Sequence, residues 1–124
     1  MAAGKYSFII EQGSTVDFSI VYSDSNGNPV NLVEFDSKMQ IRETYTSAPL
    51  LTLSSSLNGD GTGLNMTNAA SGTIGIYIAS CTSSMLTFNE AIYDLDIISG
   101  SSCPVVIRIL EGKVKLSKEV TVVD

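Results

Sequence analysis

The chain has 124 residues, 44% of them hydrophobic and 16% charged, with 13 acidic against 7 basic side chains. This length predicts a single domain, residues 1–124, large enough to bury a core of its own. The net charge of −6 repels nucleic-acid backbones and anionic lipid headgroups, and no apolar run approaches the roughly 20 residues of a membrane span. We therefore expect neither a nucleic acid nor a membrane as a partner.

Histidine and tryptophan are both absent. Without histidine the commonest general base and metal ligand at neutral pH is missing, which excludes Ser-His and Cys-His catalytic pairs. We accordingly expect no enzyme activity, no cofactor and no metal. The two cysteines, Cys81 and Cys103, form a disulfide only if the fold brings them together, and in an intracellular protein we expect both to be free and packed.

Short alternating segments separated by turn residues fill the first half of the chain. Val16, Phe18 and Ile20 share one face, the alternation typical of a half-buried strand. The turn formers that follow include Asn26-Gly27, two residues that tolerate a positive φ, and predict a tight hairpin turn. The strands expected in this half are residues 6–12, 15–22, 30–32, 37–43, 50–53 and 64–66.

The second half is organised around a predicted antiparallel hairpin of residues 91–116. Its first strand places Tyr93, Leu95 and Ile97 on one face and Asp94 and Asp96 on the other, wet face. A Gly/Ser/Pro loop at residues 99–104 separates this strand from the next. Other expected features are a strand at residues 73–78, a helical turn at residues 80–86, a bulge or twist at Glu111-Gly112 and a continuing strand at residues 113–117.

Turn signals about every ten residues, between seven or eight short strands, predict an all-β fold, a β-sandwich or a small barrel, of which we expect a single antiparallel β-sandwich. The apolar, β-branched ending Val120-Thr121-Val122-Val123 has two interpretations. It is either the last strand of the sheet or a segment that adds to the sheet edge of a neighbouring protein.

Two groups of polar residues fit a metal or catalytic site on spacing alone. Asp24, Asn26 and Asn28 have the 1-3-5 spacing of a calcium loop, but the later ligand positions fail and a hairpin turn explains them better. Asp94 and Asp96 face the same way, as paired acids do in glycoside hydrolases. A wet strand face neutralised by a cross-strand Arg108 or Lys113 is the favoured interpretation. Three lysines in or just after the predicted strand of residues 113–117, Lys113, Lys115 and Lys118, are expected to form a solvated row that protects an edge.

Several short motifs together resemble a family of small tailed-phage virion proteins. They are Ile10-Glu11-Gln12-Gly13-Ser14-Thr15, Asp24-Ser25-Asn26-Gly27-Asn28-Pro29-Val30-Asn31-Leu32, Lys38-Met39-Gln40-Ile41-Arg42, Gly72-Thr73-Ile74, Tyr93-Asp94-Leu95-Asp96 and Leu110-Glu111-Gly112-Lys113-Val114. The chain is also similar to the immunoglobulin-like N-terminal domain of phage upper-baseplate proteins, which anchors receptor-binding proteins. Departures occur at Val33-Glu34-Phe35-Asp36 and at the longer loop containing Cys103-Pro104.

This resemblance implies an immunoglobulin-like sandwich that serves as a multi-copy adaptor in the phage tail or baseplate. Its partners would be other virion proteins, and it would be made in the host cytoplasm without a signal peptide. Partner contacts are expected from the rim loops and the chain end, at Asn26, Asn28, Ser101, Pro104, Val120, Thr121, Val122 and Val123. A capsid decoration protein is one alternative. A carbohydrate-binding module is another, with Tyr45 and Tyr77 as the outward aromatic residues.

Overall fold

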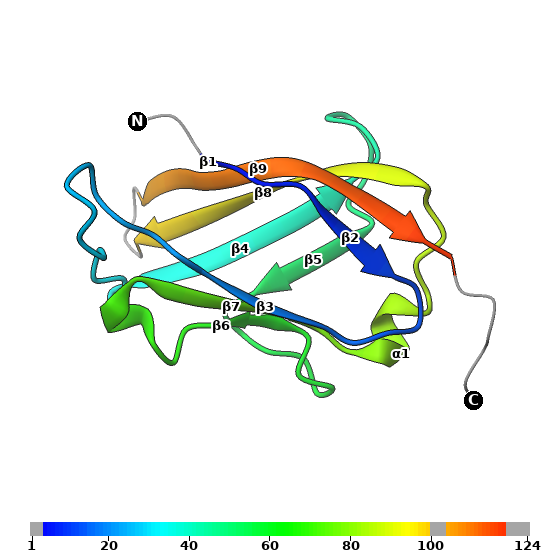
Figure 1. Cartoon of the computed structure of the whole chain (residues 1–124), viewed down its shortest axis with the longest axis horizontal. Coiled ribbons are helices and arrows are strands. Elements are labelled where there is room, and N and C mark those ends of the chain that lie inside the picture. The colour runs from blue at the N-terminus through cyan, green and yellow to red at the C-terminus, as the bar shows by residue number, and fades with distance from the viewer. Residues whose placement is uncertain (1–3, 100–103, 119–124) are drawn as a thin grey trace.

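The computed structural model of the chain describes residues 4–99 and 104–118, and within them it contains nine strands arranged in two facing sheets (Figure 1). The expected all-β sandwich is confirmed. The strands are β1 (Gly4–Lys5), β2 (Phe8–Glu11), β3 (Val16–Val21), β4 (Phe35–Arg42), β5 (Leu51–Ser54), β6 (Gly63–Asn65), β7 (Thr73–Ile78), β8 (Glu90–Ser99) and β9 (Val105–Ser117). Two short helices complete the described elements, the 3₁₀ helix η1 (Ala69–Ser71) and the α-helix α1 (Ser80–Ser83).

The predicted hairpin forms the centre of the larger sheet. Its strand order is β1-β9-β8-β4-β5, with β2 continuing beside β9, and β8 pairs antiparallel with both β9 and β4. Tyr93, Leu95 and Ile97 are buried as expected, while Asp94 and Asp96 lie on the outer face. Alternation along β8 therefore predicted correctly which side chains enter the core.

The smaller sheet has the order β3-β7-β6, and both pairings in it are antiparallel. Its inner face is dominated by Ile74, Ile76 and Ile78, which are at most 1% exposed. Burial of these β-branched side chains between two sheets is the main source of stability in such a sandwich. The core residues contributed by the larger sheet include Ile10, Met39, Ile41, Leu53, Leu95, Ile97, Val114 and Leu116.

The first strands pair parallel with β9, which corrects the expectation of a purely antiparallel sandwich. Gly4 of β1 lies opposite Leu110 of β9, and Phe8 of β2 lies opposite Val114 of β9. Antiparallel pairing would require the chain to enter from the opposite end of the sheet. Inside the sandwich Phe8 contacts the rings of Phe18 and Tyr93, with centroids 5.2 and 5.1 Å away, so this edge is held to both sheets.

Three local predictions need correction. The bulge in β9 lies beside Leu110 rather than at Glu111-Gly112, because the register with β8 shifts between Leu95 and Asp96. Residues 30–32 form no strand, although Leu32 is fully buried and its N–H donates to Ala69 O. Cys81 is free as expected, but it is exposed on α1 rather than packed, and Cys103 lies outside the described residues.

Candidate functional site

The loop of residues 23–29 is a hairpin turn held by its own aspartate. Asp24 Oδ1 accepts the N–H groups of Asn26 at 2.9 Å and of Asn28 at 3.0 Å. The turn prediction is therefore confirmed, but only Gly27 has a positive φ, at 83°. Asn26 and Asn28 are exposed, as a rim contact would need. Since this Asp24 oxygen already accepts two backbone donors, the arrangement matches an Asx turn rather than a calcium loop.

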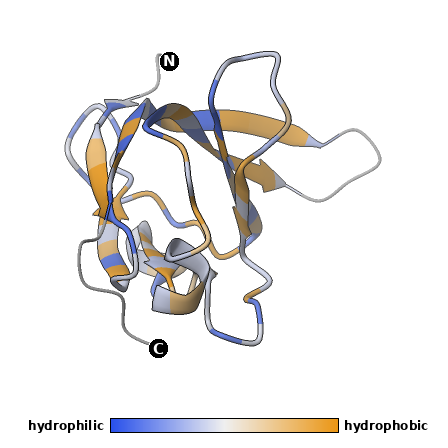
Figure 2. Ribbon diagram, turned by 90° about the vertical axis from the view of Figure 1, so that its right-hand side faces the viewer, coloured by the Kyte–Doolittle hydropathy of each residue, from blue (hydrophilic) through white to orange (hydrophobic). Residues whose placement is uncertain are grey.

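The other predicted contact loop is described only at its end. Pro104 is exposed and directly precedes β9. Ser101 lies outside the described residues, as do all four tail residues Val120, Thr121, Val122 and Val123. Figure 2 shows hydrophobic residues on β8 and β9 close to this hairpin end. On β9 these include Val105 and Val106, each 55% exposed.

A groove of about 370 Å³ separates the end of β3 from the beginning of β9. One wall carries Ile20 and Val21 and the other carries Ile107 and Ile109. The groove also includes Ser23, where the first predicted contact loop begins. The structure thus brings the base of the first predicted loop beside residues 107–110 of β9, at a groove that we call the seam groove.

The backbone of β9 is open at this groove. β1 pairs only with Leu110 and Glu111, and β2 pairs only from Val114 to Ser117. Within the described part of the chain, residues 105–108 therefore pair with β8 on one side and with no strand on the other, and Ile109 is the bulge residue, opposite no residue of β8. An unpaired edge with exposed apolar side chains is a template for the addition of another strand.

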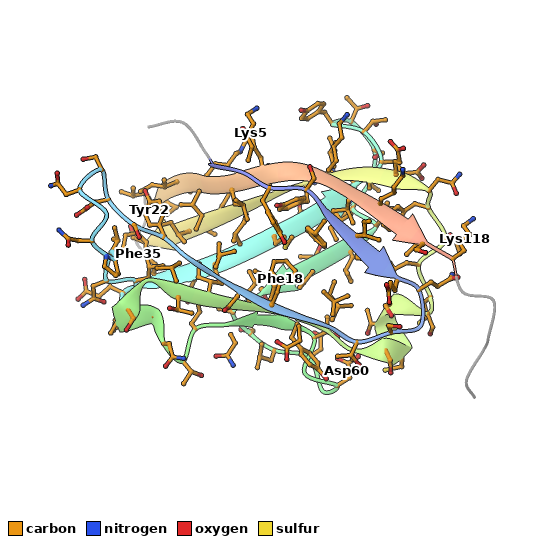
Figure 3. All side chains as sticks on the ribbon, in the orientation of Figure 1. Lys5, Phe18, Tyr22, Phe35, Asp60 and Lys118 are labelled. Carbon is orange, nitrogen blue, oxygen red and sulfur yellow. The ribbon has the colours of Figure 1, made fainter. Side chains whose placement is uncertain are left out.

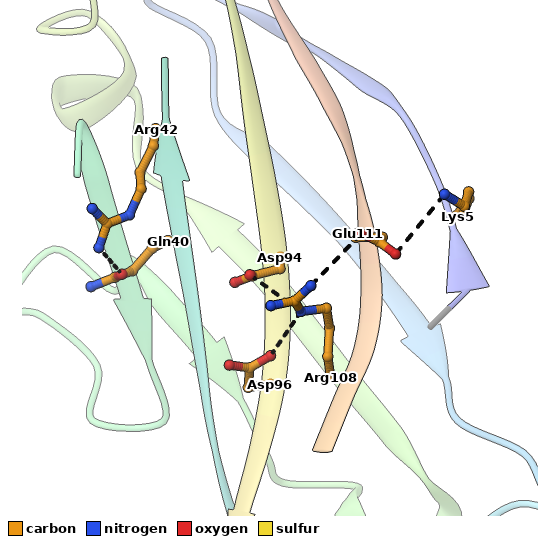
Figure 4. A network of polar contacts seen from close by, with 7 residues as sticks. All are labelled: Lys5, Gln40, Arg42, Asp94, Asp96, Arg108 and Glu111. Atoms are coloured by element: carbon orange, nitrogen blue, oxygen red, sulfur yellow. Dashed lines mark hydrogen bonds and ion pairs between the residues drawn. The ribbon is translucent and has the colours of Figure 1, made fainter. Parts of the chain in front are cut away.

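A second, more polar hollow of about 620 Å³ lies on the outer face of the larger sheet. At its centre the Arg108 guanidinium contacts Asp94 at 3.4 Å and Asp96 at 4.0 Å (Figure 4). Arg108 also lies 4.0 Å from Glu111, which in turn lies 4.0 Å from Lys5. The predicted neutralisation of the two aspartates by a cross-strand Arg108 is confirmed.

Asp96 is the least well accommodated member of this network. Its Oδ1 atom is buried and accepts no hydrogen bond from the described residues. Burial, followed by the charge of Asp94, raises the pKa of Asp96 above its ordinary range, and Arg108 only partly opposes this shift. The cost of removing the Asp96 carboxylate from water therefore offsets part of its electrostatic attraction to Arg108.

The rim of the hollow carries the tyrosine expected to face outward. Tyr45 is 83% exposed in the turn after β4 and lines the hollow, whereas Tyr77 is half-buried on β7 in the other sheet. Beside Tyr45, Arg42 donates to Ser47 O at 2.6 Å. Arg42 also donates to Gln40 Oε1 at 2.8 Å (Figure 4). Both acceptors are neutral, so the positive charge of Arg42 has no carboxylate partner among the residues the structure describes.

The lysine row has a different position from the one expected. Lys113, Lys115 and Lys118 are all exposed, as predicted. However, β9 is flanked at Lys115 by both β8 and β2, so Lys115 covers the face of the sheet rather than an edge, and Lys118 lies just beyond the end of β9.

One polar cluster was not visible in the sequence. Asp60, in the turn before β6, accepts hydrogen bonds from Thr82 Oγ1 at 2.6 Å and from Thr62 N at 2.9 Å. These bonds, that of Thr82 first, lower the pKa of Asp60 to about 2. They tie the turn to α1 across 22 positions in the sequence. Only the Asp-x-Thr spacing of a local Asx turn could have pointed to part of this arrangement.

Comparisons with known proteins leave the family open. A scan of the sequence against protein-family models finds no match, and a search among curated proteins finds none either. Over residues 4–99 and 104–118, no helix is long and apolar enough to cross a membrane. In the same residues, no three His, Cys, Asp or Glu side chains gather as metal ligands.

Proposed function

We propose that this chain is a structural virion protein of a tailed bacteriophage, a β-sandwich adaptor of the tail or baseplate that docks other virion subunits through its loops and edges. The motif resemblance supplies the virion context. The single observation that carries the docking role is the open apolar edge of β9 at the seam groove, residues 105–109.

This edge favours protein partners for two physical reasons. Its unpaired N–H and C=O groups can be satisfied by an extended segment of another chain, and the groove walls offer Ile20, Val21 and Ile107 for burial. Val105 and Val106 extend the apolar surface toward the exposed Pro104. A contact that combines strand addition with apolar burial needs no chemical reaction, as the adaptor role requires.

The strand order supports the immunoglobulin-like part of the proposal. In variable-type immunoglobulin domains one sheet holds strands G, F, C and C′, and strands B, E and D lie in the other. The orders β9-β8-β4-β5 and β3-β7-β6 follow the same pattern when the strands are assigned in chain order. Such a rigid frame presents loops to neighbours at little entropic cost.

The test is detection of the chain in purified particles. Mass spectrometry of tailed particles from the source of the sequence should find it in stoichiometric amounts, and antibody labelling should place it on the tail or baseplate. Labelling of the head would favour the capsid decoration alternative. Absence of the chain from particles that contain the other virion proteins would contradict the proposal.

A carbohydrate-binding module is the second candidate, because one observation favours it. Tyr45 projects at the rim of the polar hollow, where a sugar ring could stack while Arg42 and Gln40 bind its hydroxyl groups. A glycan array probed with the wild-type chain and with Tyr45→Ala separates the two functions. Glycan binding by the wild type that is lost in Tyr45→Ala would favour the carbohydrate-binding module. If the wild type binds no glycan on the array, this second candidate function is excluded.

A further inference from the structure

We infer that copies of this chain join head to tail, with segment 119–124 of one copy added as a strand to the open edge of β9, residues 105–109, in the next. The inference rests on the proposed docking function and names a second copy as the partner. It depends on three features, which are the acceptor edge, the composition of the chain end and the distance between the two.

The acceptor edge has both a backbone and a side-chain component. Residues 105–109 lack a strand on their outer side in the described structure, and the adjacent seam groove has room for side chains between β3 and β9. A strand added here would extend the larger sheet and cover Val21 and Ile107. Both effects remove apolar surface and unpaired polar groups from water.

The chain end has the composition of a strand. Val120, Thr121, Val122 and Val123 are all β-branched, the class of residue that favours extended backbone. In an extended segment Val120 and Val122 point to one side and can enter the groove, while Thr121 points to the other. The charged Glu119 and Asp124 flank this apolar stretch and limit the added strand to about four residues.

A chain cannot place this end on its own acceptor edge. β9 spans 13 residues, and its end at Ser117 lies about 26 Å from Ile109 at roughly 3.3 Å per residue. Segment 119–124 reaches only about 20 Å when fully extended, even before any of it pairs. The donor must therefore come from another copy.

Lys118, the last described residue before the donor segment, lies at the opposite end of the sandwich from the acceptor edge. Figure 3 shows Tyr22, which lines the seam groove, at one end and Lys118 at the other. A contact between different surfaces of identical chains is heterologous, and it generates closed rings or open filaments. A multi-copy ring or fibre is the form expected of a tail component.

Residues 1–3 of the same chain are the competing occupant. The parallel register of β1 would carry Met1, Ala2 and Ala3 along residues 107–109. Two alanines bury little apolar surface compared with the valines of the chain end. Segment 119–124 of a second copy would pair with more of the open backbone groups of residues 105–109 and cover more of their apolar side chains.

The test measures the mass of the purified full chain by light scattering over a range of concentrations. The wild type should associate, whereas a chain lacking residues 119–124 and a Val106→Lys variant should each remain a single chain. Ile9→Lys is the matched control, since Ile9 is 61% exposed on the edge strand β2 and should associate normally. Val21→Lys is a second acceptor variant in case Val106→Lys fails to fold by circular dichroism.

Complementation gives the decisive result. The truncated chain keeps the acceptor and Val106→Lys keeps the donor, so their mixture should form a complex of two chains and no larger species. A labelled peptide of residues 119–124 should bind the truncated chain about tenfold more tightly than it binds the truncated chain carrying Val106→Lys.

Three results would overturn the inference. They are a wild type that stays a single chain, a truncated chain that still associates, and a mixture that does not combine. Association that appears only after residues 1–3 are removed would assign the edge to the N-terminus of the same chain. None of these results bears on whether the chain is found in virions, so failure of the inference is distinguishable from failure of the proposed function.

Discussion

Gly112 faces the main-chain carbonyl group of Tyr6 so closely that a Cβ atom at Gly112 would overlap the Tyr6 oxygen and lie 2.7 Å from its carbon. The Tyr6 N–H donates to Glu111 O at 3.0 Å, and the Tyr93 hydroxyl donates to the same Tyr6 oxygen. The first strands can therefore dock on β9 only because residue 112 has no side chain.

Gly112→Ala should destabilise the fold by about 1–3 kcal/mol, because the new methyl group must push Tyr6 away from β9. Urea unfolding followed by circular dichroism measures the change. Gly59→Ala is the matched control, since a Cβ at Gly59 meets nothing within 4 Å and should change stability by less than about 0.5 kcal/mol. Equal effects of the two substitutions would contradict this role of Gly112.

Tyr93→Phe should cost about 1 kcal/mol at neutral pH, because the hydroxyl bond to Tyr6 is lost while the ring stays packed. Burial, and then the neighbouring Tyr6, raises the pKa of Tyr93 above its ordinary value of 10.0. Tyr93 is thus protonated more tightly in the folded chain, and the stability it contributes is lost as pH rises above 10. Unfolding at pH 8 and pH 11 should show a smaller alkaline loss for Tyr93→Phe than for the wild type.

At pH 7, Asp96→Asn should be as stable as the wild type or more stable by less than about 1 kcal/mol. Because the pKa of Asp96 is raised above its ordinary 3.8, its favourable contribution is present below that pH and is lost as pH rises. The amide mimics the protonated form, so the advantage of the variant should vanish at pH 3. Asp94→Asn should in turn lower the pKa of Asp96, which carboxyl NMR titration would detect.

Asp60 should titrate near pH 2 in a carboxyl NMR experiment, below its ordinary 3.8. A lowered pKa means that the contribution to stability is present above the ordinary value and is lost as pH falls toward 2. The bonds to Thr62 and Thr82 should break over that range, and the protection of the Thr62 amide, relative to its intrinsic exchange rate at each pH, should fall. Asp60→Asn should show faster exchange already at pH 7, whereas Asp17→Asn, at an exposed position on β3, should not.

Side-chain alternation was sufficient to predict the strands with one buried face. Val16, Phe18 and Ile20 on β3 and Ile74, Ile76 and Ile78 on β7 follow the expected inward pattern. Period-two alternation reports the face of each residue directly, because successive side chains point to opposite sides. The hairpin of β8 and β9 was predictable for the same reason, with its loop chemistry in addition.

The neighbours of each strand could not be predicted from this signal. Alternation in residues 6–12 is the same whether they pair parallel or antiparallel with β9, so the mixed sheet was missed. Gly112 was interpreted as part of a bulge, although its role is the close approach of Tyr6, a residue far away in sequence. The seam groove likewise arises only where β3 and β9 meet.

The parallel docking of the first strands has a consequence for synthesis of the protein. Lys113 N donates to Ser7 Oγ across 106 positions in the sequence, so β2 has no strand partner until Ser117 has left the ribosome. Pairings of such long range form slowly, and the nascent chain exposes Phe8 and Ile10 in the meantime. Translation speed and chaperone capture should therefore affect the yield of this protein.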